Sequence, residues 1–109
     1  MVKTRAEVLQ VIHEFRDRLA EVYGDRLKGV YLYGSYARGE AVEDSDIDVA
    51  VVLAGPVRRR AEDHRNSDLI GDLSLRANCL LMPVFISEDD FRRTPYAIHR
   101  SIVREGVPA

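Results

Sequence analysis

Apolar residues near the start of the chain recur every three to four positions, which is the spacing of one face of an α-helix. The repeat predicts a helix over residues 4–23, and it consists of Val8, Val11, Ile12, Phe15, Leu19 and Val22. Thr4, followed three residues later by Glu7, is the pattern of a capping box at a helix start. Gly24 suits the C-terminal cap of this helix, because glycine readily adopts the backbone conformation found there.

Two short apolar runs follow and predict β-strands. Leu27–Tyr33 is rich in β-branched and aromatic residues and is followed directly by glycine. Ile47–Leu53 is almost continuously apolar, which is typical of a strand covered on both faces. The segment Gly34–Gly39 interrupts the pattern between the two strands, and Ser35 could cap a short helix there.

The next part of the chain predicts a helix and a third strand. Residues 57–77 are polar and charged, and their apolar members gather towards the end, as in a surface helix that is firmer in its second half. Cys79–Ile86 predicts a strand. Pro83 within it indicates an edge strand or a bulge, because proline cannot donate a hydrogen bond to a sheet.

The chain from Ser87 onward predicts two short helices. Ser87, followed three residues later by Asp90, is a capping pattern and should start a helix. A last helical piece begins at Pro95 and is ended by Gly106 and Pro108. The alternation of helices and strands along the chain predicts an α/β fold with a small sheet and flanking helices.

Composition sets the broad class of protein. The chain has 109 residues, so we expect one domain spanning 1–109. Apolar residues make up 46% and charged residues 31%, as in soluble globular proteins, and a formal net charge of −2 does not favour direct nucleic-acid binding. The single cysteine, Cys79, allows no internal disulfide and is expected to be a small buried apolar group. A charged N-terminus and no membrane-length apolar run predict a cytoplasmic protein without a membrane anchor.

Asp46 and Asp48 form the first candidate for chemistry. Side chains alternate along a strand, so these two carboxylates lie on one face, with Cα atoms about 7 Å apart. The two charges repel each other unless a cation lies between them, and hard oxygen ligands at this spacing suit Mg²⁺. A solvated pair of loop acids is the structural alternative.

Gly34 and Ser35 form the second candidate, at the end of the preceding strand. Glycine lets a ligand approach the backbone closely, and Ser35 offers a hydroxyl next to the N–H groups of a helix start, which favour anions. A phosphate-binding turn beside a metal-binding strand together predict a site for a nucleoside triphosphate with Mg²⁺.

These residues carry a resemblance to a known family. Gly34-Ser35, ten further residues and Asp46-Ile47-Asp48 are similar to the signature of the nucleotidyltransferase superfamily related to DNA polymerase β. The string GSYARGEAVEDSDIDVAVVL resembles the minimal nucleotidyltransferase (MNT) proteins. The resemblance implies a mixed-sheet α/β fold, ATP as donor, and transfer of a nucleotidyl group, here AMP, to a hydroxyl. It also implies a helical HEPN-domain partner. Some members of the MNT family resemble antitoxins that attach AMP to a tyrosine of that partner.

The resemblance also assigns residues. Gly34 and Ser35 would hold the triphosphate, and Asp46 and Asp48 would bind Mg²⁺ and form the catalytic pair. Arg38 lies inside the matching motif, where it could contact phosphates or instead pair with Glu40 or Asp44 on the surface. Whether the chain forms an oligomer with itself or with its partner stays open.

The family's third catalytic carboxylate has no obvious counterpart. It would sit on the strand after the helix, but NCLLMPVFIS contains no acidic residue, and Glu88 follows as a weak candidate. Two alternatives therefore stay open beside an active transferase. The chain could be a weak or inactive module that neutralises a HEPN partner by contact. A transferase acting on small molecules such as aminoglycosides is a weaker third reading.

Two further patterns favour structural roles. Arg58, Arg59 and Arg60 are a short basic run that is more often a solvated helix start than a contact for nucleic acid or an acidic partner. Tyr31 and Tyr33 alternate on a strand, where core packing is the expected role.

Overall fold

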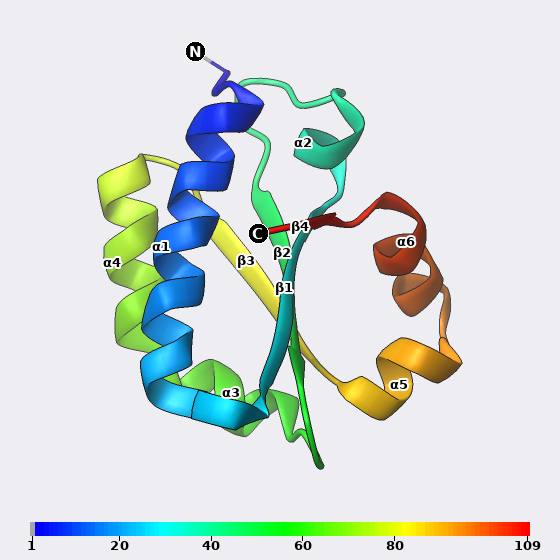
Figure 1. Ribbon diagram of the computed structural model, residues 1–109. Helices are drawn as coiled ribbons and strands as arrows, with labels where there is room; N and C mark the ends of the chain where they lie inside the picture. The colour runs from blue at the N-terminus through cyan, green and yellow to red at the C-terminus, as the bar shows by residue number, and fades with distance from the viewer. Residues whose placement is uncertain (1) are drawn as a thin grey trace.

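A mixed β-sheet separates two groups of helices in the computed structural model, which describes residues 2–109 (Figure 1). Along the chain the elements are α1 (Arg5–Tyr23), the 3₁₀ turn η1 (Gly24–Arg26), β1 (Leu27–Tyr33), α2 (Ser35–Arg38), β2 (Ile47–Leu53), α3 (Arg59–Arg65), α4 (Ser67–Ala77), β3 (Leu81–Ser87), α5 (Glu88–Arg93), α6 (Ala97–Glu105) and β4 (Val107–Pro108). The predicted α/β fold with a small mixed sheet and flanking helices is confirmed.

The strands lie in the order β3-β2-β1-β4. β1 runs antiparallel to both β2 and β4, whereas β2 and β3 are parallel. The register pairs Asp48 on β2 with Tyr33 on β1 and with Met82 on β3. Residues paired in this way point to the same face of a sheet, so these three side chains share one face.

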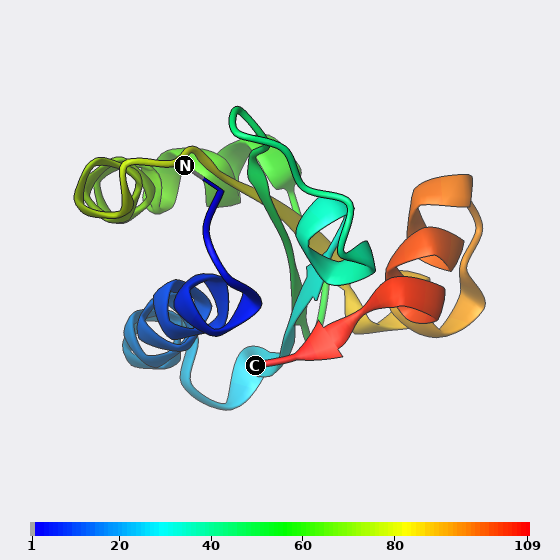
Figure 2. The same cartoon turned by 90° about the horizontal axis from the view of Figure 1, so that it is seen from above.

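Helices cover both faces of the sheet, as Figure 2 shows from above. α1 and α4 pack on one face over a large apolar core that includes Phe15, Leu32 and Phe85. α5 and α6 lie on the other face over a smaller cluster that includes Ala50, Val52 and Ile102. Because β2 is central and covered on both sides, six of its seven residues are buried, as its continuous apolar sequence predicts.

The ends of α1 match their sequence signals. The side chain of Thr4 accepts a hydrogen bond from the Glu7 N–H at 3.1 Å, and the Glu7 carboxylate accepts one from the Thr4 N–H at 2.9 Å. Gly24 forms the C-cap with a positive φ of 55°. The predicted helix and both of its caps are therefore confirmed.

The prediction of a single helix over residues 57–77 is wrong, because the chain forms two helices that meet at Asn66. The side-chain amide of this buried residue donates to the Tyr23 hydroxyl and to the Glu62 carbonyl, each at 2.8 Å. Its backbone leaves the helical region at φ −104° and ψ 10°. A side-chain hydrogen bond to the backbone thus competes with the helix and breaks it.

β3 lies at one edge of the sheet, as Pro83 predicts, but it spans Leu81–Ser87 rather than Cys79–Ile86. Pro83 pairs in register with Val49, so the bulge alternative does not apply at this position. The backbone irregularity in the sheet lies instead between Leu27 and Gly29.

The C-terminal part follows the prediction with two differences. The Ser87 hydroxyl accepts from the Asp90 N–H at 3.0 Å and caps α5, as expected. The last helix begins at Ala97, two residues later than predicted. Beyond Gly106 the chain adds a short strand that no pattern in the sequence indicates, with Val107 paired to Leu32. Within residues 2–109 no helix is both long enough and apolar enough to cross a membrane.

Candidate functional site

The turn between β1 and α2 is built around Gly34. Its φ is +78°, a conformation that side-chain-bearing residues rarely adopt, and its carbonyl accepts hydrogen bonds from Ala37 and Arg38 at 3.0 and 3.1 Å. Gly34 itself, rather than Ser35, occupies the N-cap position, and no side chain caps α2. The predicted capping role of Ser35 is therefore wrong: Ser35 is the first helical residue.

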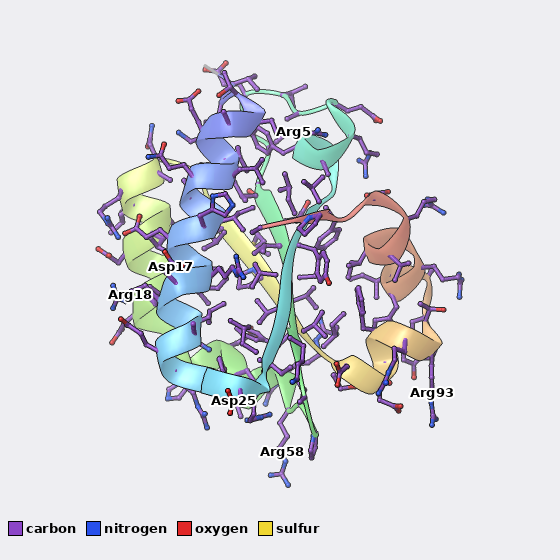
Figure 3. All side chains as sticks on the ribbon, viewed as in Figure 1. Arg5, Asp17, Arg18, Asp25, Arg58 and Arg93 are labelled. Carbon is purple, nitrogen blue, oxygen red and sulfur yellow. The ribbon has the colours of Figure 1, made fainter. Side chains whose placement is uncertain are left out.

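The short helix α2 is fixed by burial rather than by its length. Tyr36 and Ala37 are buried in the main core, next to α1. The Arg5 guanidinium, at the start of α1, donates a hydrogen bond to the Ala37 carbonyl, and Figure 3 shows Arg5 beside α2. Contacts from a neighbouring helix therefore set the position of the Gly34-Ser35 turn.

Asp46 and Asp48 flank the first residue of β2. Asp46 is exposed just before the strand, and Asp48 is partly buried within it. Both neighbours of Asp46 are tied to the chain before β3, since the Cys79 thiol donates to the Ser45 carbonyl at 3.3 Å and the Ile47 N–H donates to the Leu80 carbonyl at 2.8 Å. These bonds hold the two aspartates at the start of the central strand β2.

The turn and Asp48 are in direct contact. A Cβ atom placed on Gly34 would lie 3.1 Å from Cβ and Cγ of Asp48 and closer still to Oδ2. The absence of a side chain at position 34 is therefore what lets the Asp48 carboxylate lie against the backbone of the turn. The predicted residues Gly34, Ser35, Asp46 and Asp48 thus lie at the same end of the sheet, where β1 ends and β2 begins.

The site concentrates negative charge. Burial, and next the charge of Asp46, raise the pKa of the Asp48 carboxyl above its ordinary value, although Arg38 opposes this. Burial and the charge of Asp48 likewise raise the pKa of Tyr33 to about 12. Tyr33 packs against the smaller apolar cluster, as expected, and it also lies beside Asp48 on the same face of the sheet. A bound cation would relieve this repulsion.

Arg38 pairs with two carboxylates. Its Nε lies 3.3 Å from Glu40, which is the structural alternative named from the sequence. Its Nη1 donates to Glu105 at 3.0 Å, and the same Glu105 oxygen accepts from the Gly34 N–H at 3.1 Å. Sequence reasoning missed Glu105, because it follows Gly34 by 71 residues and no motif links the two.

The third carboxylate is not supplied by β3. The residue of β3 beside Asp48 is Met82, which is 45% exposed. Glu88 is excluded, because it follows Ser87, which pairs with Leu53 at the far end of β2, roughly 17 Å from Asp48 at 3.3 Å per residue. Among residues 2–109 no group of three carboxylate, histidine or cysteine side chains could hold a metal ion.

Two carboxylates nevertheless fit a magnesium ion in the presence of a nucleotide. Mg²⁺ usually takes one or two protein carboxylates and fills its remaining positions with water and substrate phosphates. Asp46 and Asp48 provide such a pair, and the mutual repulsion described above is the electrostatic sign of a cation site. The donor set is therefore chemically suited to Mg²⁺ bound together with a triphosphate.

Other predicted residues lie away from this site or have structural roles. Arg58 points away from the molecule at the end opposite α2 in Figure 3. Tyr31 stacks on Phe91 with ring centroids 5.1 Å apart, as expected of a packing residue. Cys79 is partly buried against the main core, where burial raises the pKa of its thiol.

Comparison with known proteins identifies the fold and its chemistry. The nucleotidyltransferase domain family matches residues 12–105, a span that includes the Gly34-Ser35 turn and both aspartates. This chain belongs to the nucleotidyltransferase domain family. The predicted resemblance and the predicted enzyme class, a nucleotidyltransferase, are confirmed by this membership and by the relatives below.

Two archaeal relatives are similar to this nucleotidyltransferase in sequence. Both come from Methanocaldococcus jannaschii. "Putative protein adenylyltransferase MJ0604" is 34% identical over 89% of this chain and 92% of its own length. "Putative protein adenylyltransferase MJ1305" is 32% identical over 73% of this chain, and the alignment spans only 55% of that longer protein.

Solved structures share the fold of this nucleotidyltransferase. The crystal structure of a "putative nucleotidyltransferase" from Sulfolobus solfataricus superimposes with a TM-score of 0.68 at 22% identity, over 99% of this chain and 87% of the other. A toxin–antitoxin complex with AMP-PNP gives 0.60 at 20% identity, over 97% and 72%. A complex of tri-AMPylated Shewanella oneidensis HEPN toxin with MNT antitoxin gives 0.54 at 21% identity, over 91% and 69%.

Proposed function

We propose that this nucleotidyltransferase transfers AMP from ATP, with Mg²⁺, to a tyrosine hydroxyl of a HEPN-domain partner and thereby acts as its antitoxin. The observation that carries the proposal is the contact of the Gly34 turn with Asp48, beside Asp46, in a chain of this family. That contact puts a backbone suited to phosphates next to two carboxylates suited to a divalent cation.

Each residue has a role in this proposal. Asp46 and Asp48 hold Mg²⁺, while Gly34, Ser35 and Arg38 hold the triphosphate. When bound, Mg²⁺ neutralises charge on the transferred phosphoryl group and on the leaving pyrophosphate and helps to activate the hydroxyl. The hydroxyl oxygen would bond to the α-phosphorus as the bond from that phosphorus to pyrophosphate breaks, and the hydroxyl proton would be released to solvent water. The residues of the turn act by orientation, which supplies much of the catalysis in phosphoryl transfer.

The choice of partner rests on relatives. MJ0604 is named as a protein adenylyltransferase, and the Shewanella oneidensis complex contains an AMPylated HEPN toxin with an MNT antitoxin of the same fold. We extend both the acceptor class and the partner to this chain as a proposal. A cytoplasmic location, expected from the sequence, stays a prediction.

A second function is favoured by one observation. Met82 occupies the place beside Asp48 on β3, and no residue of this strand, on which the family pattern expects an acid, is acidic. With no carboxylate on β3 to join Asp46 and Asp48, the chain could bind and neutralise a HEPN partner by contact without transfer. This alternative predicts that neutralisation survives the loss of both aspartates.

The test combines nucleotide binding with modification of the partner. Calorimetry with ATP, with and without Mg²⁺, compares the wild type with an Asp46→Asn/Asp48→Asn variant. An Asp44→Asn/Glu40→Gln variant is the matched control, because it removes two exposed carboxylates from the same loop. Intact-mass measurement of a co-expressed HEPN partner then counts the added AMP groups.

We expect Mg²⁺-dependent binding and AMP addition in the wild type and the control, and neither in the Asp46/Asp48 variant. Transfer that persists without both aspartates would overturn the site assignment. An unmodified partner that is still neutralised by the double variant would establish the contact mechanism instead.

A further inference from the structure

Glu105 places a carboxylate on the phosphate side of the site. It is the last residue of α6, and its side chain is only 14% exposed. One oxygen, Oε1, accepts hydrogen bonds from the Gly34 N–H at 3.1 Å and from Arg38 Nη1 at 3.0 Å. A surface carboxylate rarely loses so much solvent without a specific arrangement of donors.

The two donors bound by Glu105 are the groups that the proposed function assigns to the triphosphate. A single N–H gives its full hydrogen bond to one acceptor at a time, so a phosphate oxygen and the Glu105 carboxylate cannot both take the Gly34 N–H. The two anions also repel each other.

We propose that Glu105 occupies the phosphate-binding groups of the nucleotide-free protein and that the triphosphate displaces it. This inference rests on the proposed function and assigns a new role to a residue outside the family motif. Glu105 imitates the charge of a phosphate, keeps Arg38 and the Gly34 turn in a binding geometry, and sets an affinity threshold for nucleotide.

The position of Glu105 links the site to the end of the chain. The residue that follows it, Gly106, donates to the Ile102 carbonyl at 2.7 Å, and Val107 then pairs with Leu32 on β1. This short connection holds the Glu105 backbone next to the turn. Displacement of the side chain by a nucleotide therefore needs only a rotamer change or a local movement of the last turn of α6.

The test is calorimetry of ATP with Mg²⁺ on the wild type, Glu105→Ala and Glu105→Gln. We expect about tenfold tighter binding for Glu105→Ala, since a competing charge-assisted hydrogen bond is lost, and a smaller gain for Glu105→Gln. Glu40→Gln is the matched control, because it also removes a carboxylate from Arg38 but leaves the Gly34 N–H untouched. Its affinity should stay within about twofold of the wild type.

A second readout separates displacement from simple repulsion. The amide resonance of Gly34 should differ between the free wild type and free Glu105→Ala and should converge once both are saturated with ATP, because a phosphate is then the acceptor in each. Resonances that stay as far apart as in the free proteins would show that Glu105 keeps its contact, and would overturn the proposal.

The binding results also separate this inference from the function on which it rests. If the wild type binds ATP as tightly as both Glu105 variants, the proposed function is not overturned, but the displacement role of Glu105 is. Weaker binding by both variants overturns it too and makes Glu105 a positioning residue for Arg38 or a ligand of the metal. If neither the wild type nor Glu105→Ala binds ATP, the proposed function fails, and the displacement role fails with it.

Discussion

The α-carbon of Gly34 lies against the side chain of Asp48, so closely that a Cβ on Gly34 would lie 3.1 Å from both Cβ and Cγ of the aspartate. The backbone at Gly34 also has a positive φ of 78°. Position 34 therefore requires glycine for two independent reasons, one local and one tertiary. The second reason ties the conformation of the turn to the carboxylate that we assign to Mg²⁺.

Gly34→Ala should reduce both stability and nucleotide binding. The positive φ and the clash with Asp48 together should lower the free energy of unfolding by about 2–3 kcal/mol. Mg²⁺-dependent ATP binding should be lost, because either the turn or Asp48 must move. Urea unfolding and calorimetry measure the two effects.

Gly39→Ala is the matched control for that substitution. Gly39 also has a positive φ, 74°, but a Cβ added there would meet nothing within 4 Å. It should cost about 1 kcal/mol of stability and leave ATP binding intact. Equal loss of binding in the two variants would show that backbone strain, and not the contact with Asp48, is responsible.

Asp48→Asn should stabilise the protein at neutral pH when no divalent cation is present. Burial, and next the charge of Asp46, raise the pKa of Asp48 in the folded state, so its charged form is destabilising above that pKa. The advantage of the variant should shrink as the pH falls through the raised pKa and vanish below the ordinary value of 3.8. Thermal unfolding in EDTA at a series of pH values measures this difference.

Added Mg²⁺ should reverse the order. Mass action stabilises a folded state that binds the ion, so millimolar Mg²⁺ with ATP should raise the unfolding temperature of the wild type but not of Asp48→Asn. Asp44→Asn, at an exposed position in the same loop, should respond like the wild type in both conditions. A wild type no less stable than Asp48→Asn in EDTA would contradict the electrostatic argument.

Tyr23→Phe should destabilise the protein without affecting the site. The Tyr23 hydroxyl donates to the buried Glu62 carboxylate at 2.6 Å and accepts from Asn66 at 2.8 Å, which joins α1 to α3 and α4. Removal of the hydroxyl leaves the buried side chains of Glu62 and Asn66 each with one hydrogen-bond partner fewer. This change should lower the free energy of unfolding by about 2 kcal/mol. Chemical unfolding measures the loss, and ATP binding should be unchanged.

Tyr23→Phe should also change how the free energy of unfolding depends on pH in the alkaline range. Burial, and next the hydrogen bond to Glu62, raise the pKa of Tyr23 from 10 to about 12. The folded state therefore holds the phenol proton where the unfolded state has lost it, so stability falls as the pH rises from 10 to 12. Tyr23→Phe should lose less stability over this range. Tyr31→Phe, whose ring stacks on Phe91, is the control and should stay within about 0.5 kcal/mol of the wild type.

Local sequence was sufficient for most of the elements and for the residues of the motif. Some patterns involve only residues that are close together in the sequence, so they can be recognised from the sequence alone. They are the helical repeat and capping box of α1, the apolar run of β2 and the proline of the edge strand β3. The Gly-Ser and Asp-x-Asp spacing likewise lies within fifteen residues. It was enough to predict that the Gly34 turn and Asp48 would lie together.

Tertiary structure decided what depends on distant parts of the chain. The break at Asn66 exists because Tyr23, 43 residues earlier, offers a hydroxyl to its side chain. Register alone puts Met82 beside Asp48 and sends Glu88 to the far end of the sheet. Glu105 reaches the Gly34 N–H only because α6 folds back over the sheet. Contacts between residues this far apart leave no periodicity or spacing in the sequence, so only the folded chain could place a third carboxylate next to the turn.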